Sequence, residues 1–262
     1  MRQEKFTNYW IGEEKIPLNQ MPAYVDVVPL AFVQLGSNNT LDFTFLTQNY
    51  SPGQIQSWIK EVRSNMTKVV FSLGINSVDG VDPTAFVNNV LQNVNEWGVD
   101  GVDFDYEPAD LDYSKNQATV LQIAQQLRYV LGNNALLTAP IWSPWLDYPD
   151  FLKRFAAPLD YLTTMDYSPY LGFEYTINYY NQYAQVIGTA DNPQYGKVAI
   201  GTICIAKDSG MNTPIDDVVK LCQWEPPNNT KKGMMLYTFS YDQEGRIEPP
   251  GNYTSTINQY LP

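Results

Sequence analysis

Short apolar runs alternate with amphipathic segments along the whole chain. Several of the apolar runs are rich in Val and Ile without strict alternation, which is typical of parallel strands covered on both faces. Eight runs are predicted as strands, at Thr7–Ile11, Val25–Leu35, Lys68–Gly74, Val99–Tyr106, Ala135–Ile141, Leu159–Tyr167, Lys197–Ile205 and Gly233–Tyr241.

Helix start and stop signals lie between these predicted strands. Ser51-Pro52, Asp82-Pro83 and Thr213-Pro214 each place a capping residue before a proline, which suits the first turn of a helix. The second helix is then expected to stop at Gly98. The alternating order favours an α/β fold, a single (β/α)8 TIM barrel that occupies residues 1–262 as one domain. Residues 12–24 are too short and proline-containing for a regular first helix.

Composition narrows the possible partners and chemistry. The net charge is −12 and no basic stripe is present, so neither nucleic acid nor an anionic membrane is an expected partner. No apolar run reaches the roughly 18 residues of a membrane span. The sequence has no histidine, which excludes Ser-His-Asp and Cys-His catalysis and His-ligated metals. No metal or other cofactor is expected, and acid–base chemistry must use carboxylates, Tyr, Lys or Cys with shifted pKa values.

The two cysteines, Cys204 and Cys222, are expected to be free buried thiols. Two sulfurs alone cannot complete a zinc site. A disulfide is the less favoured alternative, because Cys204 ends a predicted strand and Cys222 lies on a predicted helix.

The most informative stretch is GVDGVDFDYEP, which places acids inside a predicted buried strand. Asp103, Asp105 and Glu107 share parity, so their side chains point to one face of the strand, expected to be the barrel interior. Successive residues on one face are about 6–7 Å apart along the strand, which puts Glu107 at the carboxyl-terminal mouth and Asp103 deepest. Barrel enzymes keep their chemistry at this mouth. Asp100 has the opposite parity and is expected to shape the start of the strand.

Three carboxyl groups in one column should not ionise independently. Like charges this close raise the pKa of at least one, so we expect one or two protons to be shared along the column. A glutamic acid with a raised pKa is a suitable general acid near neutral pH. The structural alternative, that Asp103 and Asp105 only bond backbone groups or lysines, explains three acids on one face less well.

Asp100–Glu107, DGVDFDYE, resembles the DGxDxDxE signature of glycoside hydrolase family 18, the chitinases and their relatives. Other segments are similar to motifs of that family in the expected order. Ala31-Phe32 resembles the end of its second strand, and Lys68–Asn76 its third. Met165–Tyr167 resembles its sixth-strand Met-x-Tyr, and Gly233–Asp242 its eighth strand.

The resemblance implies a retaining mechanism in which the substrate assists. Glu107 would be the general acid and base, and the 2-acetamido oxygen of the substrate would attack C1 to give an oxazolinium ion. Asp105 would orient the acetamido group, Asp103 would share a proton with Asp105, and Tyr167 would donate a hydrogen bond to the acetamido oxygen.

The substrate-binding side chains expected from the resemblance and from strand-end aromatics are Tyr237, Met165, Trp142, Trp145, Phe32 and Tyr9, with Trp10 and Tyr170 as further candidates. Tyr237 stands where the family usually has Trp beneath the sugar, and Ser168 where it commonly has Asp. Asp166 has outward parity and is expected to be structural. About 27 residues separate Ile205 from Gly233, too few for the insertion that walls the cleft of many chitinases. An open cleft and internal cleavage are therefore expected.

The favoured function is an endo-acting chitinase whose partner is chitin or another N-acetylglucosamine-containing oligosaccharide. An endo-β-N-acetylglucosaminidase acting on N-glycan cores is the main alternative. A catalytically silent lectin on the same fold is less favoured because Glu107 is retained, and a peptidoglycan hydrolase is weaker still. We expect a monomer, secreted after removal of a signal peptide; the sequence itself does not show such a signal.

Overall fold

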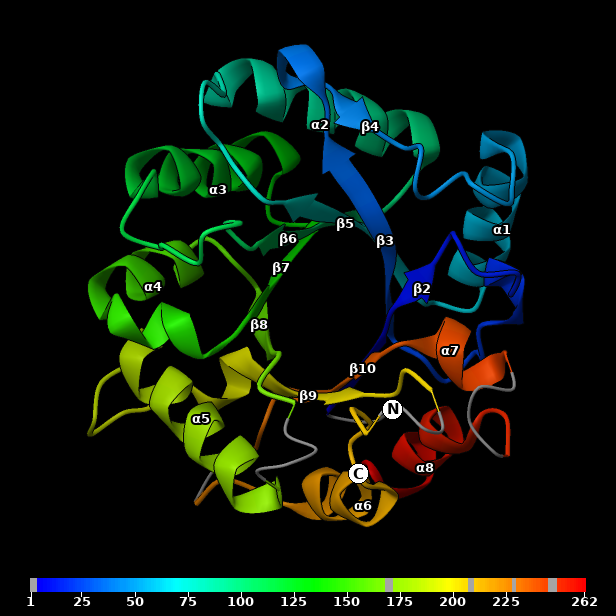
Figure 1. Ribbon diagram of the computed structural model, residues 1–262, viewed down its shortest axis with the longest axis vertical. Helices are drawn as coiled ribbons and strands as arrows, with labels where there is room; N and C mark the ends of the chain where they lie inside the picture. The colour runs from blue at the N-terminus through cyan, green and yellow to red at the C-terminus, as the bar shows by residue number, and fades with distance from the viewer. Residues whose placement is uncertain (1–3, 168–171, 207–209, 228–229, 245–248) are drawn as a thin grey trace.

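The computed structural model describes residues 4–167, 172–206, 210–227, 230–244 and 249–262, and its strands close into a parallel barrel (Figure 1). The first and last strands join because β1 pairs in parallel with both β10 and β3. The strands are β1 (Lys5–Asn8), β2 (Trp10–Ile11), β3 (Val27–Leu35), β4 (Leu41–Asp42), β5 (Lys68–Ile75), β6 (Gly101–Tyr106), β7 (Leu136–Ile141), β8 (Tyr161–Thr164), β9 (Val198–Ile203) and β10 (Gly233–Tyr237).

Eight barrel positions arise from these ten strands. The first position is shared by β1 and β2, which are interrupted at Tyr9 and both pair with β3. Strand β4 lies off the barrel path and pairs antiparallel with the end of β3. The predicted single (β/α)8 barrel is therefore confirmed.

The helices surround the barrel and cover the outer face of its strands (Figure 1). As predicted, the connection over residues 12–24 has only a 3-10 turn, Leu18–Gln20. The α-helices are α1 (Pro52–Ser64), α2 (Pro83–Trp97), α3 (Gln117–Leu131), α4 (Pro149–Ala156), α5 (Gly172–Ile187), α6 (Ile215–Gln223), α7 (Phe239–Gln243) and α8 (Asn252–Tyr260).

The predicted helix caps at Ser51 and Asp82 are confirmed, but the one at Thr213 is wrong, because α6 begins at Ile215 after Pro214 and the Thr213 hydroxyl instead accepts a hydrogen bond from the Ile203 backbone N–H. Ser51 and Gln54 form a reciprocal capping box at the start of α1. The Asp82 carboxylate accepts hydrogen bonds from two backbone N–H groups at the start of α2. That helix ends at Gly98, whose φ of 68° is a left-handed conformation that glycine adopts without steric cost.

Three predicted strands are too long at their carboxyl ends, the seventh by two residues because β9 ends at Ile203. The sixth run ends as a strand at Thr164, before Met165–Tyr167. The eighth run ends at Tyr237, and the residues after it form α7. The hydroxyl of Thr238 accepts a hydrogen bond from the backbone N–H of Tyr241 and so begins a helix where the sequence pattern still resembles a strand.

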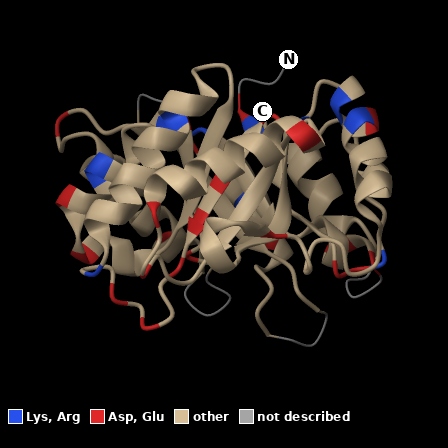
Figure 2. Ribbon diagram, turned by 90° about the horizontal axis from the view of Figure 1, so that it is seen from above, with Lys and Arg blue, Asp and Glu red and all other residues tan. Residues whose placement is uncertain are grey.

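The remaining global expectations concern cysteines, membranes and charge. Cys204 and Cys222 are both buried thiols that form no disulfide, as predicted. Over the described ranges, no helix combines the length and apolar character that a membrane crossing requires. Most Lys and Arg lie towards the end of the barrel that carries the two termini (Figure 2). Among the described residues, few Lys and Arg lie at the carboxyl-terminal mouth at the other end (Figure 2).

Candidate active site

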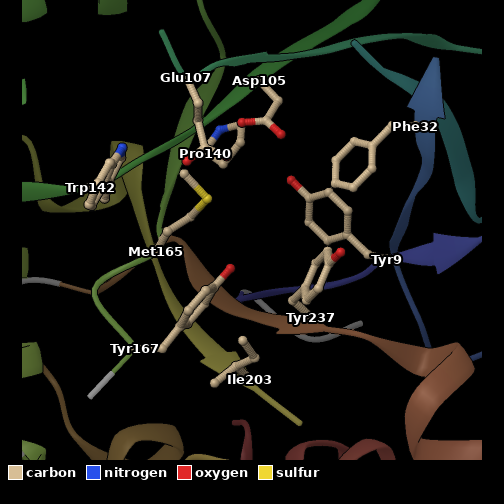
Figure 3. A pocket seen from close by; sticks show the side chains of 10 residues that line it. All are labelled: Tyr9, Phe32, Asp105, Glu107, Pro140, Trp142, Met165, Tyr167, Ile203 and Tyr237. Atoms are coloured by element: carbon tan, nitrogen blue, oxygen red, sulfur yellow. The ribbon is translucent and has the colours of Figure 1, made fainter. Parts of the chain in front are cut away.

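A pocket of about 340 Å³ opens at the carboxyl ends of the barrel strands, and Figure 3 shows its lining side chains. Most of its walls are apolar or aromatic, and its carboxyl groups come from the end of β6. The lining residues are Tyr9, Phe32, Asp105, Glu107, Pro140, Trp142, Met165, Tyr167, Ile203 and Tyr237.

Asp105 and Glu107 enter this pocket from one strand, as their parity predicts. Asp105 is 6% exposed, and its Oδ1 has no hydrogen-bond partner within the described part of the chain. Burial, and after it the charges of Glu107 and Asp103, raise the pKa of Asp105 well above its ordinary value. Burial also raises the pKa of Glu107, which is partly exposed. Both groups therefore favour the protonated form more than ordinary carboxyls do.

Asp103 lies beneath the pocket and is held by hydroxyl groups. Its Oδ2 accepts hydrogen bonds from Tyr9 Oη at 2.6 Å and Ser72 Oγ at 2.9 Å. Its Oδ1 accepts one from Thr138 Oγ1 at 2.6 Å. Burial raises the pKa of Asp103, although these three donors oppose the rise. The proposed sharing of a proton between Asp103 and Asp105 stays a prediction.

Three aromatic rings form one wall of the pocket. Phe32 stacks on Tyr237 with ring centroids 6.3 Å apart, and Tyr9 lies 5.8 Å from Tyr237. Non-proline cis peptide bonds join Ala31 to Phe32 and Tyr237 to Thr238. The Tyr9 ring lines the pocket (Figure 3), and its hydroxyl donates the hydrogen bond to Asp103 Oδ2. These residues give the pocket a mostly apolar aromatic wall next to the carboxyl groups.

Met165 and Tyr167 line the pocket from the segment that follows β8. The hydroxyl of Tyr167 points into the cavity (Figure 3). Burial raises the pKa of Tyr167 well above its ordinary value, and the neighbouring Tyr237 and Asp105 add to this rise. Tyr167 therefore stays protonated and can donate a hydrogen bond into the pocket.

The two predicted tryptophans have different positions. Trp142 lines the pocket, and its Nε1 donates a hydrogen bond to Tyr113 Oη at 2.8 Å. Trp145 is fully buried and stacks on Phe151 with centroids 5.2 Å apart and ring planes 3° apart. The expectation that Trp145 binds substrate is therefore corrected, because the 3-10 turn Ser143–Asp147 directs its ring into the core.

Three other candidates can also be placed. Trp10 is fully buried and donates a hydrogen bond from Nε1 to Ile16 O, so it too belongs to the core. Asp166 accepts hydrogen bonds from the Ser143 backbone N–H and the Tyr183 hydroxyl, which agrees with its predicted structural role. Burial raises the pKa of Asp166 to about 6. Ser168 and Tyr170 lie outside the described residues.

Sequence reasoning missed the donors to Asp103 and parts of the pocket wall. Strand register places Ser72 and Thr138 directly beside Asp103, in one layer of the barrel interior. Their inward parity is a usable signal, but it becomes specific only once the register of β5, β6 and β7 is known. Pro140 and Ile203 in the pocket wall carried no chemical signal.

Comparison with known proteins identifies the family. The model of the glycosyl hydrolases family 18 matches residues 4–215, which span most of the chain. The chain belongs to this family. It is therefore a glycoside hydrolase, and the carboxyl groups of β6 lie at the mouth where barrel enzymes act.

One curated protein and two solved structures are similar to this family 18 chain. A protein named chitinase from Enterococcus faecalis is 24% identical over 163 residues, which cover 58% of this chain and 46% of the relative. The match thus spans less than half the length of that relative. A family 18 chitinase from Pseudoalteromonas aurantia has a TM-score of 0.79 at 21% identity, covering 98% of this chain and all of the other. An endo-β-N-acetylglucosaminidase from Cordyceps militaris has a TM-score of 0.73 at 14% identity, covering 100% and 91%. At these identities the two structures show a shared fold.

Proposed function

We propose that this protein is an endo-acting chitinase, which hydrolyses β-1,4 linkages between N-acetylglucosamine units with retention of configuration. The curated relative and several proteins of the same fold carry the name chitinase. The pocket supports glycoside hydrolysis, because the carboxyl groups that line it, Asp105 and Glu107, both come from the end of β6.

One observation carries this proposal: the buried carboxyl group of Asp105, whose Oδ1 has no hydrogen-bond partner among the described residues, lies beside the candidate acid Glu107 at the end of one strand. Glycosidases that use two carboxylates place them on opposite sides of the scissile bond. Among the described residues that line this pocket, the only carboxyl groups are these two. The nucleophile is therefore best supplied by the 2-acetamido group of the substrate.

In the first step, Glu107 gives its proton to the glycosidic oxygen as the bond from C1 to that oxygen breaks. The acetamido carbonyl oxygen attacks C1 and forms a cyclic oxazolinium ion. Asp105 accepts a hydrogen bond from the acetamido N–H, which orients the carbonyl oxygen and stabilises the positive charge. The Tyr167 hydroxyl donates a hydrogen bond to the acetamido oxygen.

In the second step, the Glu107 carboxylate takes a proton from water as the water oxygen bonds to C1. The bond from C1 to the acetamido oxygen breaks, the ring opens, and the anomeric configuration of the substrate is restored. The sugar that carries this chemistry would lie over Tyr237, Tyr9 and Phe32, whose faces match the apolar face of a pyranose ring.

The proposed function also includes where the enzyme cleaves the polymer and where the protein acts. Internal cleavage is favoured because the connection from β9 to β10 contains α6 and leaves little chain for a further domain beside the cleft. A polymeric substrate favours action outside the cell, and we propose that the protein is secreted and acts as a monomer, the default for a barrel of this kind.

An endo-β-N-acetylglucosaminidase acting on N-glycan cores is the second candidate. It would use the same acids and the same acetamido group. It is favoured by the fold shared with the Cordyceps militaris enzyme over the full length of this chain. A silent lectin is less consistent with the pocket, because Glu107 is present and its pKa is raised.

Hydrolysis of fluorogenic chitobiose and chitotriose glycosides tests the proposal, with Glu107→Gln as the control. Turnover by the wild type that the variant lacks supports the chitinase. If the wild type cleaves only a high-mannose glycoprotein, the second candidate replaces it. If neither substrate is cleaved but chito-oligosaccharides bind, the protein is a lectin.

A further inference from the structure

Tyr113 is a buried residue beside the pocket that the proposed mechanism does not use. It lies in the connection between β6 and α3 and is 0% exposed. Its ring packs edge-on against Tyr106, with centroids 5.8 Å apart, and lies 4.8 Å from Trp145. A phenylalanine would make the same ring contacts, so the hydroxyl needs a separate explanation.

That hydroxyl joins two parts of the pocket. It accepts the hydrogen bond from Trp142 Nε1 at 2.8 Å and donates one to the backbone carbonyl of Tyr106 at 3.3 Å. This carbonyl belongs to the peptide bond that leads into Glu107. The N–H on the other side of the same peptide bond donates to Ile75 O at 3.0 Å. Tyr113 therefore links the backbone of the catalytic acid to the indole of Trp142.

Trp142 and the aromatic wall lie on different sides of Glu107. Figure 3 shows Glu107 between Trp142 on one side and Asp105 on the other, with Phe32 and Tyr237 beyond Asp105. The sugar that reacts at C1 needs Asp105 and the aromatic wall. The sugar that leaves with the proton from Glu107 must then extend towards Trp142.

We propose that Tyr113 is a positioning residue that holds the Trp142 indole as the platform for the leaving-group sugar. The inference rests on the proposed function, since it assigns a sugar to each side of Glu107. A tryptophan side chain has rotational freedom at two torsions, and binding a sugar on a free ring would cost entropy. The hydrogen bond from Nε1 fixes the ring before the substrate arrives.

The test is the cleavage of chitohexaose, in which internal cleavage places a sugar on the leaving-group side. Tyr113→Phe keeps the packing and removes only the hydroxyl, so we expect KM to rise about fivefold, the effect of one ordinary hydrogen bond, with little change in kcat. Tyr180→Phe is the matched control. Tyr180 is equally buried, its hydroxyl donates to Tyr195 O at 2.9 Å, and it does not line the pocket. This control should leave KM unchanged.

A double-mutant cycle with Trp142→Phe shows whether Tyr113 acts through Trp142. The ring in Trp142→Phe has no N–H, so adding Tyr113→Phe should not raise KM further. The inference is overturned if Tyr113→Phe behaves like the Tyr180 control, if it lowers kcat at constant KM, or if the two changes are additive.

Failure of the proposed function would look different, because the wild type itself would then cleave neither chitohexaose nor a high-mannose glycoprotein. In that case the dissociation constants of the wild type and Tyr113→Phe for chitohexaose test the positioning role. About fivefold weaker binding by Tyr113→Phe would support the positioning role. Equal binding by both proteins, or no binding by the wild type, would overturn it.

Discussion

The two ends of strand β6 bury carboxyl groups in opposite ways. At the amino end, Asp100 pairs with Arg63 at 2.9 Å and Lys68 at 3.0 Å, and accepts a hydrogen bond from the Val69 backbone N–H. Burial pushes its pKa up, but these donors outweigh burial and hold the pKa below its ordinary value. At the mouth, Asp105 has a raised pKa, and its Oδ1 has no hydrogen-bond partner in the described residues.

Between these ends, Asp103 is held by three neutral hydroxyl groups and its pKa is raised by burial. Along one short strand, Asp100 thus has charged donors, Asp103 has neutral donors, and the Oδ1 atom of Asp105 has no donor among the described residues. The comparison indicates that the amino end contributes to stability, whereas the mouth keeps a carboxyl group available for a ligand. Four substitutions test this division, in order of decreasing effect.

Glu107→Gln should have the largest effect. The amide cannot donate a proton to the leaving oxygen, so kcat should fall on the order of 10³-fold. Chitohexaose binding to the variant, measured by calorimetry, should persist because the pocket wall is unchanged. Comparable kcat values for variant and wild type would remove Glu107 from the chemistry.

Asp105→Asn should lower kcat by about 10²-fold, because an amide no longer stabilises the positive charge at the acetamido group. Its melting temperature should equal or exceed that of the wild type. The folded-state pKa of Asp105 is raised, so the wild type loses stability as pH rises above the ordinary value of 3.8, and the variant does not. A variant less stable than the wild type at pH 7 would contradict this account.

Asp100→Asn is the matched change at the other end of the strand and should give the opposite result. Loss of the charged hydrogen bonds should cost about 2 kcal/mol of unfolding free energy at pH 7, with kcat unchanged. Because the pKa of Asp100 is lowered in the fold, this difference should shrink as pH falls below 3.8. Denaturant unfolding at pH 7 and pH 3 measures it, and a pH-independent cost would be inconsistent with the ion pairs.

Thr138→Val should have the smallest effect. It removes one of the three hydroxyl donors to Asp103 and should cost about 1 kcal/mol, less than the change at Asp100. Thr138→Ser keeps the hydroxyl and should restore most of that stability. A cost above that of Asp100→Asn would show that neutral donors are worth as much as the cations.

Local signals in the sequence were enough to predict much of this molecule. The parity of Asp103, Asp105 and Glu107 put their side chains on one face, because successive side chains of a strand point to opposite sides. The alternation of strands and helices predicted the barrel, and the caps at Ser51 and Asp82 act within a single turn of chain. The parity, the caps and each single strand or helix depend on neighbours only a few residues away.

Only the tertiary structure decided which residues meet across the barrel. Trp142 and Trp145 look alike in the sequence, yet one lines the pocket and the other packs on Phe151. Tyr9 Oη reaches Asp103 across 94 positions of chain, and Trp142 Nε1 reaches Tyr113 across 29. Such contacts depend on strand register and on the paths of the connections. A pattern along the chain gives the face on which a side chain lies, but not its partner on another strand.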